Sequence, residues 1–191
     1  SAPIPRNRIE KDTLVMGVDP GPTESAYAII RPNYTIVRAA KVENHLLDLD
    51  DRPEGRICHV VIEGLACYGR PVGRETFETA YMVGRLCERT EVAGIPWTIY
   101  ARPVYANAIA GCGKVTDAIL YQALRLRFGG NGKGEPLYPL KGCSDLRSAF
   151  AIAAYWLDCH KFCRYPKCGQ AKSYSTHLVD SLTYRLVKNK A

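Results

Sequence analysis

Short apolar runs alternate with polar turns in the first quarter of the chain. Residues 14–18 read LVMGV and residues 26–30 read AYAII, and a turn of Pro20, Gly21 and Pro22 lies between them. A third strand-like stretch over 34–42 follows a second turn at 31–33. Because turns this short join antiparallel neighbours, the pattern predicts a meander of strands over 13–18, 25–30 and 34–42.

Strand-like and helical periodicities alternate along the rest of the chain. A polar segment at 44–56 predicts a loop or a short helix. The later elements are a strand over 57–63, a helix over 76–89, a strand over 96–100, and helices that begin near residues 117, 145 and 178. Strands that alternate with helices in this way predict an α/β domain with a mixed sheet flanked by helices.

Acidic residues stand where the apolar runs end. Asp19 closes the first run, Glu63 closes the run ICHVVIE, and Asp145 opens a late alanine-rich helix. A carboxylate beside buried strands is costly unless a cation meets it. Each acid also has a structural interpretation, since Asp19 can cap its own turn and Asp145 can be a helix N-cap. Glu63 can pair with an arginine at 70, 74 or 85.

Length and composition favour one domain with a small appendage. The 191 residues are 47% hydrophobic, which suits a single sizeable core. We expect a loose arm over 1–12, a domain over 13–158, and a Cys/His-rich extension with a C-terminal helix over 159–191. The net charge of +7 and the pI near 9.0 indicate a polyanionic partner.

Targeting and cysteine patterns predict a reducing compartment. The sequence has no apolar run long enough to span a bilayer and no signal-peptide pattern, so we expect no membrane association. The eight cysteines are then expected to be thiols or metal ligands, not disulfides. A cytoplasm is the simplest location.

Four sequence blocks, in order over residues 14–154, resemble RuvC-type Holliday-junction resolvases. MGVDPGPTESAYAII resembles the first motif of these nucleases. VIEGLACYGRPVGRETFETAYMVGRL is similar to a motif of the RuvC-like proteins of phages and prophages. GKVTDAILYQALRLRFGG and GEPLYPLKGCSDLRSAFAIAA are similar to later segments of the same group. The resemblance implies a ribonuclease H-like fold and a bacterial or phage-infected cell.

The resemblance also implies a metal site. Asp19, Glu63 and Asp145 take the places of metal-binding acids, and three crowded carboxylates need divalent cations such as Mg²⁺, with Mn²⁺ as a substitute. The family has a further acid where this chain has Ser148. Asp117 or a water is expected to fill that place. Lys114 is the expected lysine that neutralises the scissile phosphate.

The expected activity is divalent-metal-dependent cleavage of branched DNA, foremost Holliday junctions, by phosphodiester hydrolysis. The expected DNA contacts are Tyr68, Arg70, Arg74, Arg85, Lys133 and Lys141. Because a four-way junction has two-fold symmetry, cutting it at two strands predicts a homodimer. The alternatives are a non-catalytic, structure-selective binder on the same fold, or a nuclease for flaps, other DNA or RNA.

The C-terminal segment has two interpretations. Cys159, Cys163, Cys168 and His177 can hold a structural Zn²⁺, with His160 as a spare ligand, or the cysteines are free thiols. His177 and Asp180 also resemble the His-x-x-Asp pattern that ends some RuvC-like nucleases. Asp145 is the preferred position for the last acid, because the fold needs no Cys-rich insertion before its final helix.

Overall fold

A five-stranded mixed sheet organises the residues that the computed structural model describes, which are 13–49, 55–66, 69 and 71–161. The strands are β1 (Thr13–Asp19), β2 (Glu24–Ile30), β3 (Ile36–Glu43), β4 (Arg56–Gly64) and β5 (Trp97–Ala101). Their order is β3-β2-β1-β4-β5, with β1, β2 and β3 antiparallel and with β4 parallel to both β1 and β5. The predicted meander and α/β class are therefore confirmed.

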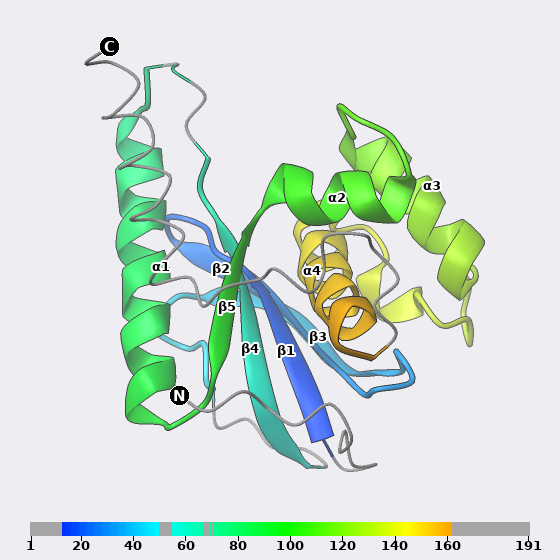
Figure 1. Ribbon diagram of the computed structural model, residues 1–191, viewed down its shortest axis with the longest axis horizontal. Helices are drawn as coiled ribbons and strands as arrows, with labels where there is room; N and C mark the ends of the chain where they lie inside the picture. Colours follow the sequence, from blue (N-terminus) through cyan, green and yellow to red (C-terminus); the bar gives the residue numbers. More distant parts are fainter. Residues whose placement is uncertain (1–12, 50–54, 67–68, 70, 162–191) are drawn as a thin grey trace.

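Helices cover both faces of this sheet. They are α1 (Arg74–Val92), α2 (Arg102–Ala110), α3 (Asp117–Phe128) and α4 (Ser144–Lys161), with a short 3₁₀ turn η1 (Tyr138–Leu140) before α4. In Figure 1, α1 lies on one side of the sheet, and α4 lies on the other side with α2 and α3 beyond it. The helix α2 was not predicted, because it follows β5 without an intervening loop.

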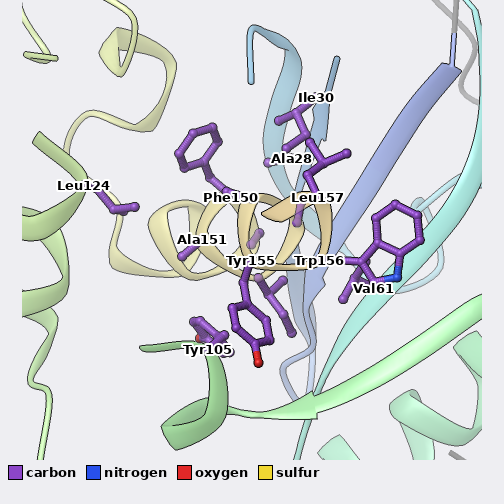
Figure 2. Packing of buried hydrophobic residues seen from close by; sticks show 14 of the residues in the cluster. Ala28, Ile30, Val61, Tyr105, Leu124, Phe150, Ala151, Tyr155, Trp156 and Leu157 are labelled. Atoms are coloured by element: carbon purple, nitrogen blue, oxygen red, sulfur yellow. The ribbon is translucent and has the colours of Figure 1, made fainter. Parts of the chain in front are cut away.

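The continuous apolar run of β1 is explained by burial on both faces. Leu14, Met16 and Val18 belong to the cluster that packs against α1, whereas Val15 belongs to the cluster around α4. Figure 2 shows residues of the second cluster, including Phe150 of α4, with sheet residues beside the helix. Alternate residues of the strand therefore serve two separate cores.

Gly17 lets α4 lie directly on β1. A Cβ atom at this position would be 2.0 Å from the backbone oxygen of Ala149 and 2.9 Å from Cβ of Ala153. Only a glycine in the strand, opposite small residues on the helix, allows so close an approach. Since Asp145 precedes Ala149 by one helical turn, this packing also fixes the start of α4 over the sheet.

The expected ends of the domain can be compared with the described residues only in part. Helix α4 continues to Lys161, so the expected boundary after residue 158 falls inside a helix. The N-terminal arm and the final helix from about 178 lie outside the described residues. No helix in the described part of the chain is long and apolar enough to cross a membrane.

Candidate active site

One row of residues across the sheet carries the two strand carboxylates. Lys41 of β3 pairs with Ala26 of β2, and Ala26 pairs with Asp19 of β1. Val18 pairs with Ile62, so Asp19 lies beside Glu63 at the carboxyl ends of the parallel strands β1 and β4. Ala26 belongs to the core cluster around α4, which places this row on the α4 face. The two acids therefore point to the same side of the sheet.

Asp145, in the first turn of α4, lies beside this row on the α4 face of the sheet. Its Oδ2 atom lies 2.9 Å from Nζ of Lys41, and the Ser144 hydroxyl donates a hydrogen bond of 3.1 Å to its Oδ1 atom. The close packing of α4 at Gly17 brings the helix start to this position. The structure thus brings together the three acids that the sequence singled out.

The pKa values show how crowded these carboxylates are. Burial, then the charges of Glu63 and Asp145, raise the pKa of Asp19 to about 8, although Arg102 acts in the opposite direction. Burial also raises the pKa of Glu63, against the hydrogen bond from Tyr105 and the charge of Arg102. Burial disfavours ionisation of Asp145, but its contacts with Lys41 and Ser144 outweigh that effect and lower its pKa. Negative charge is therefore in excess around Asp19.

Two residues of α2 complete the site, and the sequence interpretation missed both. The Tyr105 hydroxyl donates a 2.5 Å hydrogen bond to Oε2 of Glu63. Arg102 donates from Nη1 to the Ser148 hydroxyl at 2.7 Å, and the same nitrogen lies 4.0 Å from Oε2 of Glu63. Its Nη2 atom forms an ion pair with Asp117. A charged residue at the end of an apolar strand was the available signal, because Arg102 follows β5 directly, just as Asp19 ends β1 and Glu63 is the second-last residue of β4.

The remaining expected site residues are placed as follows. Asp117 forms an ion pair with Arg102, and its charge contributes to the raised pKa values of both Asp19 and Glu63. Lys114 is exposed, in a left-handed backbone conformation between α2 and α3, and among the described residues it has no ion pair with the acids. Its role at a phosphate stays a prediction.

The expected DNA contacts and zinc ligands also stay predictions. Arg74, Arg85, Lys133 and Lys141 are exposed, while Tyr68 and Arg70 lie outside the described residues. Arg74 donates a 2.7 Å hydrogen bond to Glu78. Cys159 is buried in the core around α4, and the other proposed zinc ligands, Cys163, Cys168 and His177, lie outside the described residues.

The chemistry of the donor set fits a divalent cation. Carboxylate oxygens are the ligands that Mg²⁺ prefers, and burial together with the charges of Glu63 and Asp145 raises the pKa of Asp19. In the described residues, no group of three or more His, Cys, Asp or Glu side chains has the arrangement of a formed metal site. The side chains of Asp19, Glu63 and Asp145 would therefore have to adjust around a bound ion.

A mixed five-stranded sheet of this order, flanked by helices, defines the ribonuclease H-like class of fold. Comparison with solved structures shows which folds of this class the chain is similar to. The chain is similar to "T. thermophilus RuvC in complex with Holliday junction substrate", with a TM-score of 0.60 and 18% identity over 78% of this chain and 94% of that one. A second Thermus thermophilus RuvC structure matches with a TM-score of 0.57 and 20% identity over 75% of this chain and 94% of that one.

The yeast mitochondrial Holliday junction resolvase Ydc2 also matches, with a TM-score of 0.48 and 13% identity over 86% of this chain and 88% of that one. No protein-family model matches the chain, and no curated protein is significantly similar to it. The RuvC-like fold predicted from the sequence is thus confirmed by the two Thermus structures. The phage or prophage type stays a prediction.

Proposed function

We propose that this protein is a divalent-metal-dependent endonuclease that cuts branched DNA, and that its main substrate is the four-way Holliday junction. One observation carries the proposal: Asp19 and Glu63, far apart in the sequence, lie side by side at the carboxyl ends of β1 and β4, and Asp145 of α4 contacts Lys41 in the same row. The fold shared with a RuvC that was solved on a Holliday junction supports the choice of substrate. The positive net charge of the chain agrees with a nucleic-acid partner.

Asp19, Glu63 and Asp145 are the residues that hold Mg²⁺ or Mn²⁺ in this proposal. A divalent cation at such a site supplies Lewis-acid stabilisation of phosphodiester oxygens and lowers the pKa of a water for attack. Because burial and the neighbouring carboxylates raise the pKa of Asp19 to about 8, this residue would have to lose its proton before it could act as a ligand. Metal binding should therefore release protons near neutral pH and tighten as the pH rises.

The neighbouring residues hold these carboxylates in place. Tyr105, which is fully buried, directs its hydroxyl at Glu63 and fixes the orientation of that carboxylate. Lys41 and Ser144 keep Asp145 ionised and anchored. Arg102 compensates part of the negative charge around Asp19 and Glu63. The site is thus supported by α2, α4 and β3, in addition to the two strands that supply its acids.

A second candidate is a structure-selective DNA-binding protein that does not cut. Ser148 favours it, because this buried hydroxyl stands where the resemblance expects an acid. Nucleases for flaps, other DNA or RNA differ from the main proposal in substrate alone. A homodimer remains the proposed assembly, since two symmetric cuts need two sites.

The test is a cleavage assay on synthetic four-way junctions, flaps, linear duplexes and RNA duplexes, in Mg²⁺ and in Mn²⁺. We expect junction cleavage by the wild type, a loss of at least 100-fold for Asp19→Asn and Glu63→Gln, and retained junction binding by both variants. Glu91→Gln is the matched control, since it removes an exposed carboxylate from the last turn of α1. A wild-type protein that binds the junction but leaves every substrate uncut contradicts the enzymatic proposal and favours the non-catalytic one.

A further inference from the structure

Arg102 occupies an unusual position for an arginine, because it lies among the groups proposed to bind metal. Its guanidinium contacts the Ser148 hydroxyl, pairs with Asp117 and lies 4.0 Å from Glu63. Its charge also acts on Asp19. The side chain retains 30% of its exposure, so it is neither a surface arginine nor a fully enclosed one.

Among the described residues, Lys41 and Arg102 are positively charged side chains beside the acids, and they differ in burial. Lys41 contacts Asp145, lies 3.7 Å from Glu24 and has a side chain that is 39% exposed, so it lies at the solvent-exposed edge of the site. Arg102 reaches inward to Glu63 and to Ser148, which is only 2% exposed. An arginine stays charged at any pH that the protein tolerates, and its planar group offers several donors at once. It can therefore act as a permanent cation inside the site.

Ser148 links this arginine to the missing acid. It lies one turn after Asp145 on α4, where a carboxylate would face the same space and could hold a further cation. In this chain the position carries a neutral hydroxyl, which accepts the hydrogen bond from Arg102. The guanidinium of Arg102 thus lies where a cation bound by an acid at position 148 would be expected.

We propose that Arg102 is the built-in second cation of the site, so that Asp19, Glu63 and Asp145 take up one divalent cation where a second ion would otherwise be needed. This inference rests on the proposed metal-dependent function and deepens it. Arg102 compensates the acids in the metal-free protein, and Ser148 holds its guanidinium beside Glu63. The loss of the acid at 148 and the presence of Arg102 then form one coupled adaptation.

The experiment is a titration with Mn²⁺ alone, without DNA, followed by calorimetry and by the electron paramagnetic resonance signal of free Mn²⁺ at pH 8.5. The wild type should bind one Mn²⁺ per chain. Arg102→Gln should bind Mn²⁺ at least tenfold more tightly, because a positive charge beside the ligands is removed. The double variant Arg102→Gln/Ser148→Asp should bind two ions. Arg56→Gln, which removes an exposed arginine from the start of β4, at the opposite end of that strand from Glu63, should bind as the wild type does.

A second measurement separates this role from a merely structural one. In EDTA, Arg102→Gln should melt at a lower temperature than the wild type, because its carboxylates are less compensated, and saturating Mn²⁺ should remove most of that difference. Arg56→Gln should show no such dependence on Mn²⁺.

The outcomes distinguish the two proposals. Two Mn²⁺ ions in the wild type, or unchanged or weaker binding by a folded Arg102→Gln variant, overturn the role of Arg102 and leave the metal-dependent nuclease standing. A folded wild type that binds no Mn²⁺ at any pH tested removes the proposed metal site itself. If the double variant does not fold, the stoichiometry of the wild type and the affinity of the single variant still decide the question.

Discussion

Gly17→Ala tests whether the contact between α4 and β1 positions the acids that we propose to bind metal. The new Cβ atom would lie 2.0 Å from the carbonyl oxygen of Ala149, a backbone atom that cannot rotate away. An ordinary separation of about 3.4 Å requires α4 to move outward by about 1.4 Å, carrying Asp145 away from Asp19. Overpacking of this kind costs about 1–3 kcal/mol of unfolding free energy.

The effect on cleavage should exceed the effect on folding. A displacement of about 1 Å in a catalytic group lowers activity on the order of 100-fold, so a similar loss is expected here. Urea denaturation gives the unfolding free energy, and single-turnover cleavage of a four-way junction in Mg²⁺ gives the rate. Measuring the rate well below the melting temperature ensures that the variant is folded during the assay.

Gly84→Ala is the matched control. Gly84 lies on the exposed side of α1, with nothing within 4 Å of the added methyl group. This substitution should stabilise the protein by about 0.5–1 kcal/mol and leave cleavage unchanged. If Gly17→Ala matches the wild type in both stability and cleavage, then α4 is not held against β1 by this glycine, and the reasoning is wrong.

Three further predictions concern the acids themselves. In EDTA, the melting temperature should fall between pH 5 and pH 9, because the pKa of Asp19 is raised from 3.8 to about 8 in the folded protein. The stability that this residue contributes is complete below the lower value and lost above the higher one. Asp19→Asn should flatten this pH profile, and an equal fall in both proteins would contradict the prediction. Tyr105→Phe should weaken Mn²⁺ binding by about 10–100-fold in a calorimetric titration, because Glu63 loses the donor that orients it, and unchanged affinity would refute that role. Asp145→Asn should abolish junction cleavage but not binding, whereas Asp180→Asn should leave cleavage nearly intact; the reverse result would assign the last acid to residue 180.

The sheet and its acids could be predicted because strong local signals coincide there. From Leu14 to Val18 the strand β1 is apolar apart from its glycine, and it ends at Asp19, while short turns fix the antiparallel meander of β1, β2 and β3. Asp19 is the last residue of β1 and Glu63 the second-last of β4, and parallel neighbours bring such ends together. The ordered resemblance then identified Asp145 as the third acid, although nothing local distinguishes it from an N-cap.

The support for these acids could not be predicted, because it depends on tertiary contacts. Arg102 and Pro103 follow β5 immediately, and a proline after a strand resembles a turn as much as the first turn of a helix. Tyr105 has the composition of a core residue, and its hydrogen bond to Glu63 spans 42 positions. Lys41 joins the site only because the register of β3 on β2 places it in the row of Asp19. A pairing register across three strands is not readable from one sequence with enough accuracy.

The most direct test of the central claim is a crystal structure with Mn²⁺, in which anomalous scattering locates the ion. We expect a Mn²⁺ peak within about 2.5 Å of carboxylate oxygens from Asp19, Glu63 and Asp145 together. A well-ordered structure at saturating Mn²⁺ and pH 8.5 in which these three carboxylates bind no ion would contradict the proposed metal-dependent nuclease.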